Sequence, residues 1–149
     1  MKKGLTLLEI ILVLAVIAII SGILLGAFAS FREAGQLTET HSSIIGILKD
    51  ARSRALASKG NSNYGAHFEE TKTVLFKGSA YSSSDLSNET YLLPAGIKIS
   101  AISLTGGAVD TIFTRLLGTT TASGSITIAS RRNGGQSKTI TILSTGIIK

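Results

Sequence analysis

A single carboxylate near the start of the chain stands where an ionisable group is costly. Glu9 immediately precedes a run from Ile10 to Ala29 that holds no charged residue. An acidic side chain in the middle of a membrane helix costs about 2.5–3.5 kcal/mol, and the cost falls near the helix end, where the carboxylate can reach the interface. Two interpretations follow: Glu9 lies at the membrane edge, or it meets a cation when the helix leaves lipid for protein. A free amine created just upstream by cutting the chain would be such a cation.

The other residues that could do chemistry form no pattern typical of an active site. The chain has no cysteine, no nucleotide-binding or nucleophile motif, and only two histidines, His41 and His67. His67 and Glu69 form an H-x-E pair without the cysteine pair of the zinc deaminases. The acidic loop from Asp85 to Glu89 could bind calcium, but solvation is favoured. We therefore predict that the protein is not an enzyme and has no cofactor and no metal site.

The uncharged run is long enough to span a bilayer. Its twenty residues, 10–29, would form a helix of roughly 30 Å, the thickness of the hydrocarbon core. A cleaved secretory signal has a shorter apolar core followed by a small-residue cleavage site, and the next segment, SFREAGQLTET, offers none. Lys2 and Lys3 favour a cytoplasmic N-terminus. We expect a single-pass protein of the cytoplasmic (inner) membrane, with residues 31–149 outside the cytoplasm as one domain without disulfides.

The residues around Glu9 resemble a known processing site. KKGLTLLEI is similar to the leader junction of type IV pilins and type II secretion pseudopilins: a short basic leader, a glycine, a hydrophobic residue, then a glutamate. The resemblance implies that a prepilin peptidase removes residues 1–4 by cutting after Gly4 and methylates the new N-terminus at Leu5. It also implies that Glu9 pairs with the N-terminal amine of a neighbouring subunit. A buried pair would favour one axial register, because a wrong register leaves a charge uncompensated.

The same resemblance implies a structural role in a filament. The chain would be a minor pilin or pseudopilin, surrounded by membrane lipid before assembly and then built into a type II secretion pseudopilus or a type IV pilus through its helix, residues 5–30. Its partners would be other pilin or pseudopilin subunits, the prepilin peptidase and the assembly platform in the membrane.

Many members of this family carry a proline inside the helix, where this chain has Gly26. Small residues recur here every four positions, at Ala18, Gly22, Gly26 and Ser30. Such a ridge could let neighbouring helices approach closely. Alternatively, the glycines, which each weaken a helix by about 1 kcal/mol, could permit local melting. The sequence leaves both interpretations open.

After residue 30 the apolar pattern predicts an amphipathic continuation of the helix over about 31–59, ending near Gly60. One face carries apolar or packed residues at steps of three and four: Leu37, His41, Ile44, Leu48, Ala51 and Ala55.

The sequence pattern of residues 62–149 is typical of β-strands. The clearest hairpin signal joins SITIAS to KTITIL across RRNGGQS, and another joins YGAHFE to TVLFKG. GIKISAISL and VDTIFTRL are expected to be strands, GIIK a short last strand, and SAYSSSDLSNET a loop. We predict an α+β fold in which a long N-terminal helix, half transmembrane and half amphipathic, packs on a mostly antiparallel sheet domain.

The order of several fragments in this region resembles the H-type minor pseudopilins and related minor pilins (the GspH/FimT-like domain). The fragments are DARSRALASKG at the end of the helix, LLPAGIKIS with the only proline, Pro94, and then IFTRLLG and STGIIK. This resemblance implies a pilin-like fold for the whole chain.

Charge favours a second function. The chain has 15 basic and 9 acidic residues, a net charge of +6, and no acidic residue follows Asp110. Some minor pilins of the related subgroup bind DNA during uptake through basic C-terminal residues. The candidates here are Arg115, Arg131, Arg132 and Lys138, which could neutralise phosphates. No aromatic residue interleaves with them for stacking on bases. DNA uptake is therefore the alternative, and a filament subunit is the preferred interpretation.

Overall fold

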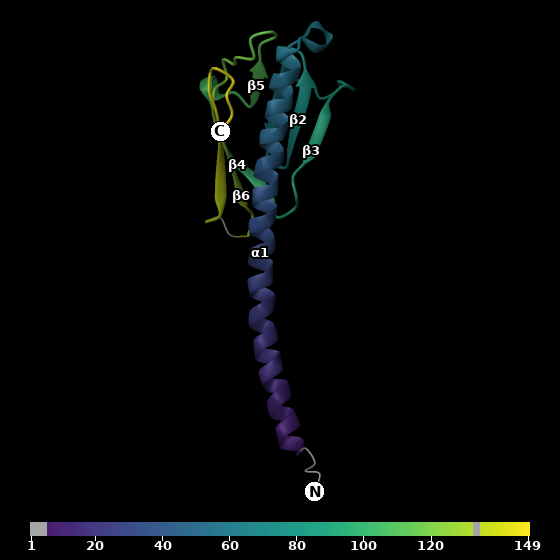
Figure 1. Ribbon diagram of the computed structural model, residues 1–149, viewed down its shortest axis with the longest axis vertical. Helices are drawn as coiled ribbons and strands as arrows, with labels where there is room; N and C mark the ends of the chain where they lie inside the picture. Colours follow the sequence, from purple (N-terminus) through teal and green to yellow (C-terminus); the bar gives the residue numbers. More distant parts are fainter. Residues whose placement is uncertain (1–5, 133–134) are drawn as a thin grey trace. The chain divides into compact units, whose positions relative to one another are not determined.

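The computed structural model describes residues 6–132 and 135–149, except for the side chains of residues 24, 25 and 27. The chain divides into two compact units, Met1–Ala34 and Gly35–Lys149. A single helix, α1 (Leu7–Leu56), provides the described part of the first unit and enters the second (Figure 1). The sequence predicts this helix over about residues 5–59, so its observed ends agree within a few residues, as is usual for helix termini.

In the first unit, the large apolar side chains of α1 are exposed along the whole described stretch from Leu7 to Ile23. An 18-residue window of this helix has a mean hydropathy of 3.0, and none of the window is buried within the protein. A core helix of a soluble protein would instead bury most of its apolar surface. This stretch is long and apolar enough to cross a membrane.

In the second unit, one face of α1 is buried against strands. The buried residues of this face lie at steps of three and four: Leu37, Thr40, Ile44, Leu48, Ala51 and Ala55. Thr40 is fully buried, whereas His41 is only half-buried. The packed face is therefore rotated slightly from the predicted one, towards Thr40. The Thr40 hydroxyl has no hydrogen-bond partner there.

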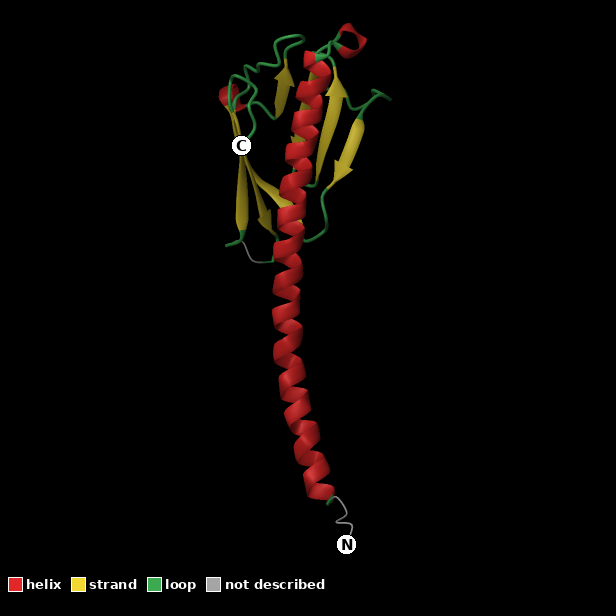
Figure 2. Ribbon diagram, in the orientation of Figure 1, coloured by secondary structure: helices red, strands yellow, loops and turns green. Residues whose placement is uncertain are grey.

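Within the described residues, seven strands and two short 3₁₀ turns follow the helix (Figure 2). The strands are β1 (Tyr64–Glu69), β2 (Lys72–Lys77), β3 (Glu89–Leu92), β4 (Ile97–Leu104), β5 (Asp110–Phe113), β6 (Gly124–Ser130) and β7 (Ser137–Ile142). The turns are η1 (Lys59–Asn61) and η2 (Thr105–Gly107). The fold class is α+β, as predicted.

The strands form two sheets rather than the one sheet that the sequence suggests. A four-stranded sheet has the order β3-β2-β1-β5, and a three-stranded sheet has the order β4-β6-β7. All the strand pairs are antiparallel, and both predicted hairpins, β1–β2 and β6–β7, are present. Apolar side chains from both sheets and from α1 meet in one core, with Phe68, Phe113 and Ile126 among the fully buried ones.

Two predictions at the strand level are wrong. GIIK is not a strand, because only an isolated bridge joins Ile148 to Ile142. The predicted loop over residues 79–90 ends early, since β3 begins at Glu89 and pairs with β2. Edge strands need less apolar pattern than central ones because water covers one side of them, and all four residues of β3 are at least partly exposed.

A β-bulge in β4 keeps its apolar side chains on the core side. Ile99 pairs with Ile128 of β6 and Ala101 pairs with Thr127, so Ser100 is the extra residue. Its hydroxyl donates a hydrogen bond to the carbonyl of Thr127, over 3.1 Å. Without the bulge, strict alternation would turn the half-buried Ile102 outwards.

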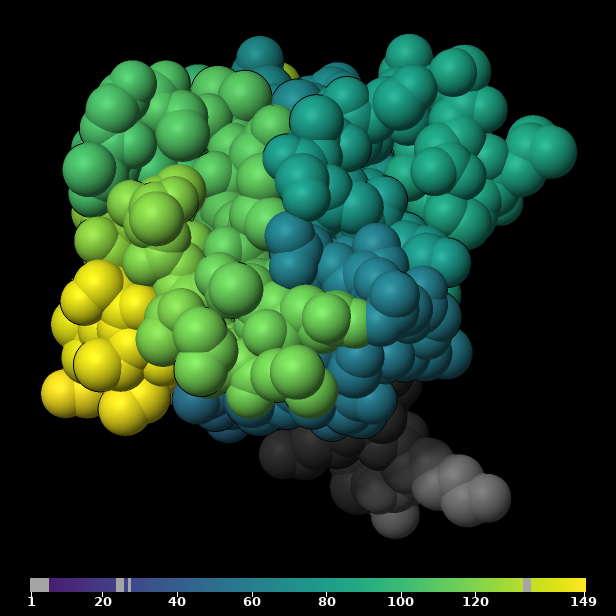
Figure 3. Space-filling model, turned by 90° about the horizontal axis from the view of Figure 1, so that it is seen from above, coloured from purple at the N-terminus to yellow at the C-terminus, as the bar shows by residue number. Residues whose placement is uncertain are grey.

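The loop after β5 is fixed against the end of α1 (Figure 3). The amide of Leu116 donates to the carbonyl of Ala55, and the side chain of Arg52 donates to the carbonyl of Gly118. Gly146 approaches the same carbonyl so closely that a Cβ there would lie 1.8 Å from its oxygen. Its φ of 77° is also in the left-handed region. Only glycine therefore suits this contact.

Candidate functional site

The first turn of α1 positions the carboxylate that the sequence singles out. The hydroxyl of Thr6 accepts a hydrogen bond from the amide of Glu9, over 3.3 Å. Thr6 is thus the N-cap of the helix and Glu9 is its third residue, the spacing of a capping box. A carboxylate in the first turn also interacts favourably with the helix dipole. The helix start therefore explains why a glutamate is favourable at this position, but it does not explain why a charge lies beside a long apolar surface.

The carboxylate itself lies exposed among apolar side chains. Leu8, Ile10 and Leu12, on the same turns of α1, are all exposed, and among the described residues no cation pairs with Glu9. An apolar surface of this kind is suited to lipid or to other helices. Any partner of the carboxylate in such surroundings must then come from outside the described part of the chain. The predicted processing residues, Gly4 and Leu5, lie outside the described residues.

The small-residue ridge lies on an unbroken stretch of helix. Ala18, Gly22, Gly26 and Ser30 are exposed, and a Cβ at either glycine would meet no atom within 4 Å. Ser30 donates its hydroxyl proton to the carbonyl of Gly26, over 3.4 Å. The ridge therefore offers a surface that another helix could approach closely. Its backbone is fully helical in the single chain.

Three of the four predicted DNA-binding residues come together, and the fourth lies elsewhere. Arg131 and Arg132 follow β6, and Lys138 of β7 pairs with Ile128 of that strand. Arg115 lies in the loop after β5, where its amide donates to the side chain of Asn63 and its guanidinium faces Ser58, beside the end of α1.

The structure adds a cation that the sequence reasoning missed. Lys98 of β4 pairs with Ala129 of β6, so it lies at the same end of the three-stranded sheet as the three others. We call Lys98, Arg131, Arg132 and Lys138 the basic end. Paired residues share a face and successive residues alternate. Lys98 and Lys138 therefore point to opposite faces of the sheet.

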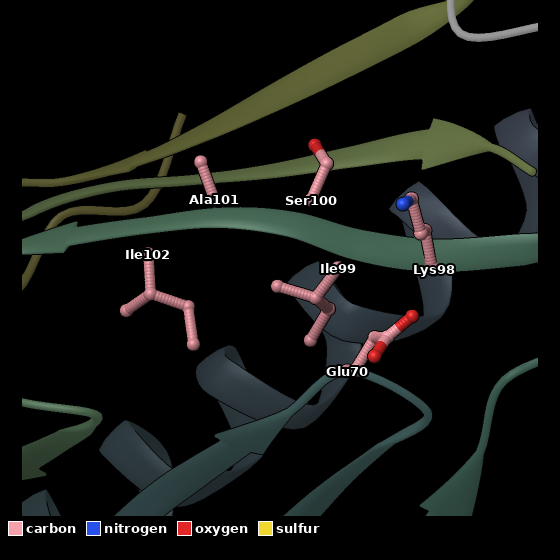
Figure 4. Close-up of a pocket in the computed structure, with 6 residues that line it drawn as sticks. All are labelled: Glu70, Lys98, Ile99, Ser100, Ala101 and Ile102. Atoms are coloured by element: carbon pink, nitrogen blue, oxygen red, sulfur yellow. The ribbon is translucent and has the colours of Figure 1, made fainter.

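A carboxylate partly neutralises this end. Arg131 forms an ion pair of 3.1 Å with Glu70, which lies in the β1–β2 turn. Glu70 and Lys98, together with Ile99, Ser100, Ala101 and Ile102, line an open pocket of about 380 Å³ (Figure 4). In Figure 4, Ile99 and Ile102 point to one side of β4, and Lys98, Ser100 and Ala101 point to the other. The pocket follows the bulge and offers one cation and one carboxylate.

His67, which forms an H-x-E pair with Glu69 in the sequence, contacts a second carboxylate in the structure. His67 hydrogen-bonds through Nδ1 to Asp110, its partner across β1 and β5, and its Nε2 lies 3.3 Å from Glu69. Its ring stacks on Tyr81 with centroids 3.9 Å apart. Lys72 also bonds Glu69 and holds the pKa of that carboxyl below its ordinary value. These contacts tie loop 78–88 to β1.

The acidic loop residues are occupied by local bonds. Asp85 accepts hydrogen bonds from both the amide and the hydroxyl of Ser87, which lowers the pKa of its carboxyl. Glu89 is paired with Arg54 of α1. Within the described ranges, no three histidine, cysteine or acidic side chains are arranged to hold a metal ion. A calcium ion bound by this loop of one chain would have to replace the hydrogen bonds of Asp85 and the ion pair of Glu89.

Comparison of the chain with protein-family models, with curated proteins and with solved structures finds no match in any of the three.

Proposed function

We propose that the protein is a prepilin-like minor pilin or pseudopilin, a structural subunit of a secretion pseudopilus or type IV pilus. The observation that carries this proposal is the first unit of the structure. An apolar helix long enough to cross a membrane is exposed on all its described turns, and it carries one exposed carboxylate in its first turn. The resemblance of KKGLTLLEI to the prepilin processing site provides the second support.

Assembly provides the carboxylate of Glu9 with a cation. When the helix moves from lipid into a bundle of like helices, the carboxylate leaves the interface and needs a cation. Cleavage after Gly4 creates an amine at Leu5, and the amine of a neighbouring subunit supplies that cation. The exposed ridge from Ala18 to Ser30 provides a place where helices can approach.

Processing is the direct test of this proposal. In cells that contain a prepilin peptidase, mass spectrometry of the membrane-purified protein should show loss of residues 1–4 and an N-methylated Leu5. Gly4→Val should block cleavage, because a side chain at this position obstructs the extended chain in the peptidase, while membrane insertion stays normal. An intact Met1 in such cells would contradict the proposal.

DNA uptake is the second candidate, and the basic end favours it. Three of its four cations are the predicted ones, and Lys98 extends the cluster. The ion pair of Arg131 with Glu70 and the separate position of Arg115 reduce the charge that one duplex could meet. A titration of the purified chain with duplex DNA tests this function, since log affinity should fall with log salt by about 0.9 per phosphate neutralised.

A further inference from the structure

Exposed apolar side chains gather around one tight contact in the second unit. The two glycines of this contact, Gly118 and Gly146, are both buried. A Cβ on Gly118 would also meet the side chain of Leu56, at 2.9 Å. Four exposed residues lie close to these glycines, and we call them the apolar patch: Leu56, Leu116, Leu117 and Ile147. They come from three segments that are distant in sequence.

The loop that carries two of these leucines has a fixed backbone. Leu116 has a φ of 67°, in the left-handed region that residues with a Cβ rarely adopt. Its amide donates to the carbonyl of Ala55 over 2.9 Å, and the amide of Gly118 donates to the carbonyl of Thr114 over 2.7 Å. A strained conformation persists only where its surroundings fix it, and such residues are common at functional sites. Here the loop holds Leu116 and Leu117 61% and 67% exposed.

A cation lies at the centre of the apolar patch. The Nε atom of Arg52 donates to the carbonyl of Gly118 over 3.2 Å, and it lies 2.8 Å from the position of a Cβ on Gly146. Among the described residues, no carboxylate forms an ion pair with Arg52 or with Arg115, which precedes Leu116. A guanidinium that is fixed through Nε can still bind a carboxylate with its terminal amino groups. The patch therefore fits a carboxylate that has an apolar side chain beside it.

The loop between β2 and β3 presents this combination. Leu86 is fully exposed, and Asp85 beside it forms no ion pair with any described residue. Lys77 favours the charged form of this carboxylate, but its effect is the weakest of those that act there. The other side-chain carboxylates described in this unit contact a basic side chain, except Glu39, which has no large apolar neighbour in the sequence. The bonds from Ser87 to Asp85 fix the shape of the loop.

We infer that the corner formed by Asp85 and Leu86 in one copy of the chain docks on the apolar patch of a second copy, with the carboxylate on Arg52. This inference rests on the proposed function and deepens it, because copies of this chain would then be neighbours in the filament. Figure 3 shows the loop after β2, in teal, and the C-terminal residues, in yellow, on opposite sides of the domain. The two docking surfaces are therefore separate, and the contact repeats from copy to copy instead of pairing two copies symmetrically.

The two surfaces are small, so free copies should attract each other only weakly. Helices packed in a bundle hold neighbouring domains together, and this raises the effective concentration of one surface around the other. Both loops have fixed backbones, so docking costs them little conformational entropy. The contact is therefore expected in filaments rather than between isolated chains.

Cysteine cross-linking tests the contact in the full chain, which has no cysteine of its own. Ser83→Cys marks the loop and Thr119→Cys marks the patch, and both positions are exposed. After oxidation of sheared filaments, a chain with both changes should give a ladder of disulfide-linked dimers, trimers and larger species. Either change alone should leave monomers, because each cysteine then faces a surface without one. Ser83→Cys with Ser103→Cys, at an exposed position of β4, should give no ladder.

Three further substitutions in this double-cysteine chain test the chemistry of the contact. Asp85→Asn keeps an acceptor for Ser87 and removes the charge, and it should lower the cross-linked fraction about fivefold. Leu86→Ser should lower it about tenfold, because the apolar anchor is lost. Glu39→Gln, which removes the same charge from an exposed position of α1, should have no effect. The tyrosine circular dichroism band of each variant should match that of the natural chain.

A double-cysteine chain that stays monomeric in filaments would overturn the inference, and so would dimers that form equally well from either single change. A ladder that Asp85→Asn and Leu86→Ser leave at full strength would also refute it, since other residues would then hold the copies together. Absence of the chain from filaments together with an intact Met1 would contradict the proposed function, and this contact with it. Processing and assembly without any ladder contradict only the inference.

Discussion

In the first half of α1, the side chain of Ile17 is 53% exposed, whereas Ile44 in the second half is fully buried. The two residues have the same side chain and the same helical backbone, but the surroundings differ. Around Ile44 the protein provides its own apolar core. Around Ile17 the described residues provide no such core, and its exposed apolar surface is suited to lipid or to another chain. One helix thus contains a segment that packs into the core of the domain and a segment whose apolar side chains remain exposed.

The largest effect is expected at Glu9, in the segment that depends on its surroundings. Glu9→Gln keeps a side chain that suits the capping box with Thr6 but removes the charge. The variant should insert and be cleaved, yet its share of sheared filaments should fall steeply, because an unpaired amine buried in the bundle costs about 3–5 kcal/mol. Quantifying the protein in the filament and membrane fractions measures this loss.

Glu9→Val provides the control for insertion. It should enter the membrane at least as well as the natural chain, since only a charge cost is removed. Normal assembly of Glu9→Val would show that the register argument is wrong.

Replacing the two isoleucines with alanine compares the halves directly. Ile44→Ala should lower the free energy of unfolding of the domain by about 2–5 kcal/mol, because it leaves a cavity in the core. Ile17→Ala should change it by less than about 0.5 kcal/mol. All three tyrosines belong to the second unit, so the tyrosine band of the near-ultraviolet circular dichroism spectrum in detergent follows the unfolding of that unit alone. Equal effects of the two changes would remove the distinction between the halves.

Thr40 offers a smaller test of how the second half is packed. Its buried hydroxyl has no hydrogen-bond partner, so Thr40→Val, which replaces it by a methyl group, should stabilise the domain by about 1 kcal/mol. Thr40→Ser keeps the hydroxyl and removes the methyl group, and should destabilise the domain. If denaturant titration shows a loss of stability for Thr40→Val, the hydroxyl has a partner in solution.

The smallest effect is expected from the ion pair of Arg54 with Glu89 on the domain surface. The hydrogen bond from Arg54 lowers the pKa of the Glu89 carboxyl from its ordinary value of 4.5. The stability that this pair contributes is therefore fully present above about pH 4.5 and is lost as the pH falls through the lower folded value.

Such a surface pair contributes about 1 kcal/mol or less. Arg54→Gln removes this pair together with the pair of Arg54 and Asp50 one helical turn away. It should lower stability at pH 7 by about 1 kcal/mol for each exposed pair at most, and the difference from the natural chain should vanish in acid. If the difference in unfolding free energy stays constant down to acidic pH, the ion pairs are not its cause. The effect would then come from lost packing of the apolar part of the arginine side chain.

The sequence predicts those features that depend on neighbouring residues. The length of α1, its buried face and both hairpins follow from local periodicity, and the fold class follows from their order. The Thr6 cap was also readable, since T-x-x-E before an apolar run is a known helix start.

Features that depend on distant pairing could not be predicted. The bond of His67 to Asp110 requires β5 to pair with β1 rather than with its sequence neighbours. Lys98 joins Arg131 only because β4 pairs with β6, across the whole of β5. A single sequence contains no signal for which strands pair when no short turn joins them, and the division into two sheets depends on such pairs.

The bulge in β4 has a consequence for how this chain tolerates changes in length. Deleting one residue from a strand normally turns every later side chain to the wrong face. Here, deletion of Ser100 would restore strict alternation, with Ile97, Ile99, Ile102 and Leu104 all still facing the core. The strand would lose the local twist and bend of the bulge but would keep its pairing with β6. β4 can therefore lose one residue inside a sheet without turning its later side chains to the wrong face, a change that most proteins accept only in loops.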